Sequence, residues 1–96
     1  MKKVALVVSI SYQEESKAAF LQALSDHQQR SLQTEAGTLQ FELLQPDELS
    51  NTIMIFELYA NQEAYQAHDQ GSSLARFKEQ AGAMITALSV QQCSVM

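Results

Sequence analysis

Apolar and polar residues alternate one by one in four short stretches of the chain. This period of two is typical of β-strands, whose successive side chains point to opposite faces of a sheet. Two longer stretches repeat apolar residues every three or four positions, which is typical of amphipathic helices. The pattern therefore predicts strands at residues 3–12, 38–45, 52–60 and 89–95, and helices at 13–34 and, in two parts, at 62–88.

Residues that favour helix ends lie at these predicted boundaries. Gly37 follows the first helix, and we expect it to adopt the left-handed conformation that glycine permits just past a helix. Asn61 is a good N-cap for the second helical region, and Gly71 with two following serines interrupts that region. After the interruption, apolar spacing predicts a further helix marked by Leu74, Phe77, Ala81, Met84, Ile85 and Leu88.

The order strand, helix, two strands, broken helix, strand predicts a ferredoxin-like α+β sandwich. Residues 46–51 include proline, aspartate, serine and asparagine, so the two middle strands are expected to form a hairpin. Right-handed crossovers then place both helical regions on one face of a four-stranded antiparallel sheet. A chain of 96 residues has the length for one such domain, spanning residues 1–96, and for no second one.

The sheet face without helices is expected to be too apolar to remain in water. Burial of apolar area is worth roughly 25 cal/mol per Å², so we predict a homodimer, a dimeric α+β barrel, in which two such open faces enclose a lined cavity. We assign to the helix side Val4, Leu6, Val8, Leu39, Phe41, Leu43, Met54, Phe56 and Leu58, and to the open face Ala5, Val7, Ser9, Gln40, Glu42, Leu44, Ile53, Ile55, Glu57 and Tyr59.

Composition and charge exclude several classes of function. The chain is 46% hydrophobic and 18% charged, which is typical of an ordered globular protein. A net charge of -5 with six Lys and Arg argues against nucleic-acid binding. The apolar run after Lys2 and Lys3 is short and alternating, so we expect a strand rather than a signal peptide, and no stretch is long enough to span a membrane. The lone Cys93 permits no disulfide within the chain, and we expect a cytoplasmic protein.

Three polar residues are predicted to meet at one corner, where a strand ends and the next helix begins: Glu57, Tyr59 and His68. His68 can exchange a proton near neutral pH and is a catalytic candidate, although such a histidine also serves as a structural partner of a backbone carbonyl. Tyr59, a second catalytic candidate, can donate a hydrogen bond to a substrate oxygen or pack at an interface. Glu57 can orient His68, bind a substrate hydroxyl or accept structural hydrogen bonds.

His27 is the third catalytic candidate, because it flanks the apolar stripe of the first helix and can either reach a cavity or cover the core. Further substrate-contact candidates are Phe41, Tyr65 and Phe77, although aromatic residues at such spacings usually pack in the core. The two histidines match no metal-binding spacing, and the chain has no phosphate-binding glycine loop or dinucleotide fingerprint. We therefore expect neither a metal nor a cofactor.

Three segments, in matching order over most of the chain, resemble the antibiotic biosynthesis monooxygenase family of small dimeric α+β barrels. They are residues 34–43, with the pattern E-x-G-x-x-x-F, residues 55–59, with the strand glutamate, and residues 63–68, with E-A-x-x-x-H. The family includes quinol and polyketide monooxygenases that use no metal or flavin, an isomerase of phosphorylated autoinducer-2 and haem-degrading members. The resemblance therefore implies a fold and does not fix the reaction.

The chain departs from the family pattern at two places. Tyr59 stands where the family usually has tryptophan, and the second histidine often found beyond the helix histidine is absent from residues 71–74. Haem-degrading members rely on that tryptophan and on a first-strand asparagine, where this chain has Ser9 and Ser11, so haem degradation is disfavoured. A tyrosine at this place with His68 is more similar to the isomerase-like members.

The resemblance and the polar corner together predict a cofactor-independent monooxygenase that oxidises a small aromatic or quinol-type substrate with dioxygen. One alternative is an isomerase of a small carbonyl compound, phosphorylated or not, as in autoinducer-2 processing. The other is a dimer that binds a small molecule without chemistry. In each case the expected partners are a second copy of the chain and a small molecule.

Overall fold

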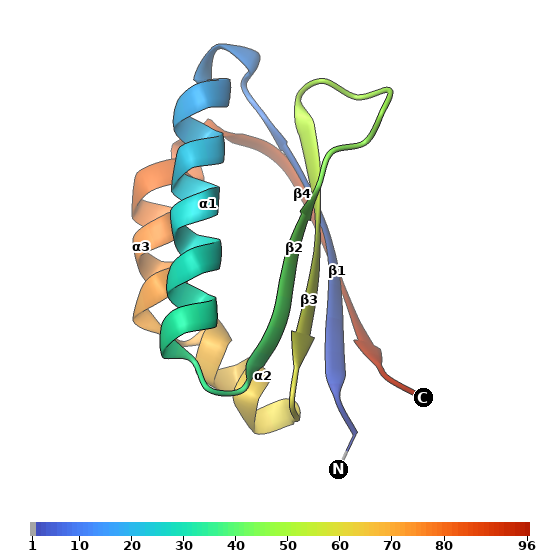
Figure 1. The fold of residues 1–96 in the computed structure, drawn as a ribbon. Helices are drawn as coiled ribbons and strands as arrows, with labels where there is room; N and C mark the ends of the chain where they lie inside the picture. The colour runs from blue at the N-terminus through green and yellow to red at the C-terminus, as the bar shows by residue number, and fades with distance from the viewer. Residues whose placement is uncertain (1) are drawn as a thin grey trace.

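The computed structural model describes residues 2–96, in which the helices pack on one face of a single sheet (Figure 1). A four-stranded antiparallel sheet and the β-α-β-β-α-β order, with the second helix broken, confirm the ferredoxin-like α+β prediction. The elements are β1 (Val4–Tyr12), η1 (Glu14–Ser16), α1 (Lys17–Thr34), β2 (Thr38–Leu44), β3 (Thr52–Tyr59), α2 (Gln62–Asp69), α3 (Ser72–Ala81), η2 (Gly82–Met84) and β4 (Ile85–Ser94), where η1 and η2 are short 3-10 helices.

The strands lie in the order β2-β3-β1-β4, and each neighbouring pair is antiparallel. The register places Leu6 opposite Glu57 and Val8 opposite Ile55. Directly opposed residues of antiparallel strands point to the same face of the sheet. Because Leu6 and Val8 are buried in the core, Ile55 and Glu57 also point toward it.

The predicted faces of β3 are therefore wrong. Ile53, Ile55, Glu57 and Tyr59 are all buried on the helix side, whereas the alternate residues Met54, Phe56 and Leu58 are only half-buried and lie on the open face. Both alternating sets of β3 are largely apolar, so hydrophobicity alone does not choose between them; the register against β1 does. A cavity enclosed between two open faces would consequently not contain Glu57 or Tyr59.

An irregularity at the start of β2 moves one further residue. The register of β2 against β3 shifts between Thr38 and Gln40, as in a β-bulge. Thr38 is consequently buried beside Tyr59, while Leu39 is 43% exposed. The prediction that Leu39 packs under the helices is wrong for this reason, whereas Phe41 is buried there as predicted.

The last helix is shorter than predicted. It ends at Ala81, and β4 begins at Ile85 after a 3-10 turn. Ile85 pairs with Tyr12 and Leu88 with Ile10, so these residues belong to the edge strand rather than to the helix. The segment fits both helical and strand spacing, and pairing with the free edge of β1 decides in favour of the strand.

Gly37 is needed for space and not for an unusual backbone angle. No residue within 2–96 has a positive φ, so the predicted left-handed conformation is wrong. A Cβ atom on Gly37 would lie 2.3 Å from the Cβ of Ala64 in α2. The Gly37 carbonyl also accepts a hydrogen bond of 2.9 Å from the Ala60 N–H, and Asn61 caps α2 as predicted, its side chain accepting from the Ala64 N–H. These contacts fix α2 closely against the start of β2.

The open face and the edge strand β4 keep considerable apolar surface in contact with solvent. Val7 and Leu44 on the open face are 41% and 49% exposed, and Leu88 and Val90 on β4 are 60% and 51% exposed. Figure 1 shows all helices on the opposite side of the sheet. None of the helices in the part of the chain described here is long and apolar enough to cross a membrane.

Candidate active site

A cavity of about 230 Å³ lies between the helix layer and the covered face of the sheet. Most of its wall is apolar, and all four strands and the helices α1, α2 and α3 contribute side chains to it. The polar and charged residues of the wall are few: His27, Glu57, His68, Asp69 and Lys78. An apolar enclosure with a few converging polar groups is the usual form of a small-molecule site.

His68 is held in this wall by a carboxylate from the turn between α1 and β2. It lies near the end of α2, is 3% exposed, and its Nδ1 is 2.7 Å from Oε1 of Glu35. The Thr38 hydroxyl donates a hydrogen bond of 2.8 Å to the same Glu35 oxygen. An ionised carboxylate only accepts hydrogen bonds, so the contact with Glu35 places a proton on Nδ1 of His68. The second ring nitrogen, Nε2, then carries the lone pair.

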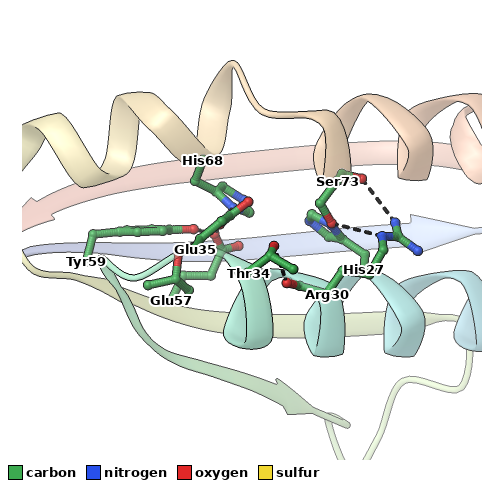
Figure 2. A network of polar contacts seen from close by, with 9 residues as sticks. His27, Arg30, Thr34, Glu35, Glu57, Tyr59, His68 and Ser73 are labelled. Carbon is green, nitrogen blue, oxygen red and sulfur yellow. Dashed lines mark hydrogen bonds and ion pairs between the residues drawn. The ribbon is translucent and has the colours of Figure 1, made fainter.

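Nε2 of His68 faces a second carboxyl group. Its distance to Oε1 of Glu57 is 3.7 Å, which is too long for a hydrogen bond and leaves Nε2 accessible to a substrate proton. The Tyr59 hydroxyl donates a hydrogen bond to this Glu57 oxygen. Figure 2 shows His68, Glu35, Glu57 and Tyr59 gathered in one group.

Burial controls the protonation of Glu57 and Tyr59. It raises the pKa of Glu57 above its ordinary value, while the hydrogen bond from Tyr59 and the proximity of His68 act in the opposite direction. Burial, with the neighbouring Glu57 carboxylate, raises the pKa of Tyr59, so this phenol stays protonated and acts as a donor. Tyr59 thus orients the carboxyl group that lies beside His68.

His27 belongs to a second polar group beside the first (Figure 2). Its Nδ1 is 2.8 Å from the Ser73 hydroxyl, to which Arg30 Nε donates a hydrogen bond of 3.1 Å. The His27 ring stacks on Phe77, and its centroid lies 5.3 Å from that of His68. Burial, the nearby His68 and the Arg30 charge lower the pKa of His27 to about 4. His27 is therefore neutral near pH 7.

The fold brings most of the predicted site residues together. Six of them line the cavity: His27, Phe41, Glu57, Tyr65, His68 and Phe77. Tyr59 is fully buried and is not part of the cavity wall, and its hydroxyl contacts the wall through Glu57. Its predicted contact with substrate stays a prediction, as do the roles of the other six.

Several polar partners were missed in the sequence, chiefly Glu35, Arg30 and Ser73. Glu35 lies inside the first segment of the family resemblance, and that position was the available signal. Arg30 follows His27 by three residues on α1, a spacing that places both on one side of a helix. Ser73 could not be found in this way, because its contact with His27 spans 46 residues of sequence.

Residues 3–80 match the model of the antibiotic biosynthesis monooxygenase family. The chain belongs to this family, as its resemblance predicts. The sequence matches no curated protein.

Solved structures with the same fold come from several bacteria. Three provisionally described antibiotic biosynthesis monooxygenases are similar. The one from Caulobacter crescentus has a TM-score of 0.94 and 18% identity over 99% of this chain and 91% of that chain. The one from Nitrosomonas europaea has a TM-score of 0.91 and 16% identity over 98% of this chain and 90% of that chain. One from Bacteroides thetaiotaomicron has a TM-score of 0.90 and 21% identity over 98% of this chain and 90% of that chain. At these identities the similarity establishes the fold.

Proposed function

We propose that this protein is a cofactor-independent monooxygenase that oxidises a small aromatic or quinol-type substrate with dioxygen. One observation supports this proposal most strongly. His68 lies in the wall of an apolar cavity with Nδ1 bound to Glu35, while Nε2 has no hydrogen-bond partner within residues 2–96. This arrangement suits a general base that acts on a bound phenol.

The first step is removal of a substrate proton. Glu35 fixes the imidazole ring and its tautomer, so Nε2 of His68 is ready to accept a proton from a phenolic hydroxyl or an acidic C–H group. The apolar wall excludes water around the resulting conjugated anion, which is thereby a stronger electron donor. The protein contributes orientation and a proton acceptor, and the substrate supplies the electrons.

Dioxygen then reacts with this anion. The anion transfers one electron to dioxygen, and the substrate radical combines with superoxide to form a carbon–oxygen bond. The peroxide takes back the proton from His68, the O–O bond breaks, and the hydrogen that remains on the oxygenated carbon leaves as a proton. One oxygen atom remains in the product as a carbonyl group, and the other leaves as water.

We also propose that the protein is a homodimer that pairs its open sheet faces. Val7 and Leu44 expose apolar surface there. A two-fold axis would bury the same patch on each subunit. Each subunit would keep its own cavity between helices and sheet.

The test is oxygen consumption with a panel of quinols, polyphenols and fused-ring phenols, followed by product analysis in ¹⁸O₂. We expect uptake above the blank, one labelled oxygen atom per product molecule, and no loss of turnover after treatment with a chelator. Uptake that never exceeds the blank, while members of the panel still raise the melting temperature, would contradict an oxygenase and favour a binding protein.

Isomerisation of a small carbonyl compound is the second candidate, favoured by the 3.7 Å separation of His68 Nε2 and Glu57 Oε1. An aldose–ketose type isomerisation needs two proton transfers, and these two groups can each hold a proton. Turnover of such a compound without oxygen uptake, lost in His68→Ala, would favour the isomerase over the oxygenase.

A further inference from the structure

We infer that the two cavity histidines have opposite and fixed hydrogen-bonding roles: His68 accepts a substrate proton, and His27 donates a hydrogen bond from Nε2 to a substrate oxygen. In this assignment Arg30 and Ser73 are positioning residues that fix the tautomer of His27. The inference deepens the proposed function, since it names the group that binds the oxygen of the deprotonated substrate.

The direction of the hydrogen bonds around Ser73 supports this assignment. The guanidinium group of Arg30 has only hydrogen-bond donors, so Ser73 Oγ accepts a hydrogen bond from Arg30 Nε. Arg30 Nη2 also donates a hydrogen bond of 3.1 Å to the Ser73 carbonyl. Ser73 is buried, and within residues 2–96 its hydroxyl has only one other polar neighbour, Nδ1 of His27 at 2.8 Å. The hydroxyl proton has a partner only if Nδ1 of His27 accepts it, and we choose this tautomer over one in which Nδ1 of the ring donates to the Ser73 backbone.

A neutral imidazole that accepts at Nδ1 carries its proton on Nε2. Nε2 of His27 makes no hydrogen bond to any of the described residues. Within residues 2–96, Ser31 Oγ is the only fully buried side-chain polar atom that lacks a hydrogen-bond partner. Nε2 of His27 lacks a partner among these residues and is not fully buried, so it keeps some accessible surface. Since His27 lines the cavity, Nε2–H is a free donor at the cavity wall.

Packing holds this donor in place. The His27 ring stacks on Phe77 at a centroid distance of 5.2 Å and meets Phe41 edge-on at 5.4 Å. A neutral, fixed donor can stabilise an oxyanion without reorganisation, which is where such groups contribute most to catalysis. The neighbouring His68 ring, 5.3 Å away, can remove the proton whose departure creates that oxyanion.

The first test reads the tautomer directly and does not depend on turnover. Two-bond ¹H–¹⁵N correlation spectra of the ¹⁵N-labelled protein at pH 7 should show His27 with its proton on Nε2. Ser73→Ala should give averaged ring shifts, because both tautomers become accessible. A wild-type proton on Nδ1, or a spectrum that Ser73→Ala leaves unchanged, would overturn the relay from Arg30 through Ser73 to His27.

The second test uses a ligand pair of one shape, 1-indanone with a carbonyl acceptor and indane without one. The ratio of their dissociation constants should fall about threefold to tenfold in His27→Phe, the usual size for one neutral hydrogen bond, and His27→Gln should restore much of it by keeping a donor. An equal ratio in wild type and His27→Phe would overturn the donor role.

The outcomes separate this inference from the proposed function. If the panel of phenols shows no oxygen uptake while the tautomer and the indanone preference are as expected, the monooxygenase proposal fails and the assignment of His27 stands. If turnover is found and His27→Phe reduces it less than about twofold, the oxyanion role fails, since loss of one such donor usually costs 10²- to 10³-fold.

Discussion

The two faces of the sheet differ in what their side chains are used for. The covered face buries Glu57 and Tyr59 among apolar residues and places them beside His68. On the open face the buried polar group of Thr52 is a neutral hydroxyl hydrogen-bonded to Ser11, and the exposed residues include Val7 and Leu44. We thus propose chemistry and subunit contact for opposite sides of the same strands.

This difference shows how register decides function in an alternating strand. Along β3 the residues of the two faces are neighbours in sequence, yet one set reaches the cavity and the other faces outward. A shift of one residue would exchange Glu57 for Phe56 or Leu58 in the cavity wall. The four predictions below test the separation of the two faces, from the largest expected effect to the smallest.

Replacing His68 tests the covered face. We expect His68→Ala to lower the turnover number by about 10²- to 10⁴-fold, because a general base usually contributes that much. Initial rates of product formation measure the effect. Gln66→Ala, an exposed change on the same helix, is the control and should leave the rate unchanged. Activity of His68→Ala within twofold of wild type would remove His68 as the base.

A charge on the open face tests the proposed dimer. The wild-type protein should sediment at twice the mass of its 10.7 kDa chain. Val7→Glu should raise the dimer dissociation constant about 100-fold or more, because an unpaired buried charge costs several kcal/mol. Gln29→Glu adds the same charge at an exposed position of α1 and should leave the mass unchanged. A wild-type monomer would contradict the dimer.

The buried neutral His27 predicts a pH-dependent stability. Its pKa is about 4 in the folded protein and 6.5 ordinarily, so the unfolded chain binds the proton more readily. The free energy of unfolding should therefore fall as pH decreases from about 6.5 to about 4, by up to about 3 kcal/mol from this group.

The matched control for this pH effect is His27→Phe, which keeps the ring and removes the titration. Glu57, whose pKa is raised by burial, changes stability in the opposite direction and is present in both proteins. The difference between the two denaturation series thus isolates His27. Curves that run parallel from pH 7 to 4 would contradict a buried neutral histidine beside Arg30 and His68.

A pair of glycines tests how closely α2 is packed on the covered side. Gly37→Ala should destabilise the fold by about 1–3 kcal/mol, because its new methyl group would overlap Ala64 in the helix that carries His68. Gly82→Ala meets nothing within 4 Å and has an ordinary helical φ, so it should be neutral or slightly stabilising. Urea denaturation measures both, and equal stabilities would contradict the close contact.

The sequence was sufficient for the fold and for six residues of the cavity wall. Alternation located the strands to within one or two residues except at β4, where the apolar spacing of Ile85 and Leu88 suits a helix as well. The same periodicity supplied the order of elements, and the family resemblance agreed with it. His68 and Glu57 were recognised because a strand end and the following helix are close in sequence.

The remainder depended on contacts between distant segments. The faces of β3 follow from its register against β1. The loop of residues 45–51 joins β3 to β2 and therefore does not reveal the register between β3 and β1. The contact from Glu35 to His68 joins residues 33 positions apart, and that from His27 to Ser73 joins residues 46 apart. Such pairs exist only after the helices pack on the sheet, so local patterns cannot show them.

The short distance between the two histidine rings limits the charge of the cavity. A proton on His68 and the fixed charge of Arg30 both oppose a second proton on His27. Above about pH 4, His27 therefore stays neutral and adds no charge to the cavity beside His68. If the proposed reaction takes place, a proton taken up by His68 has to leave before the next substrate is ionised, because His27 offers no second site for it.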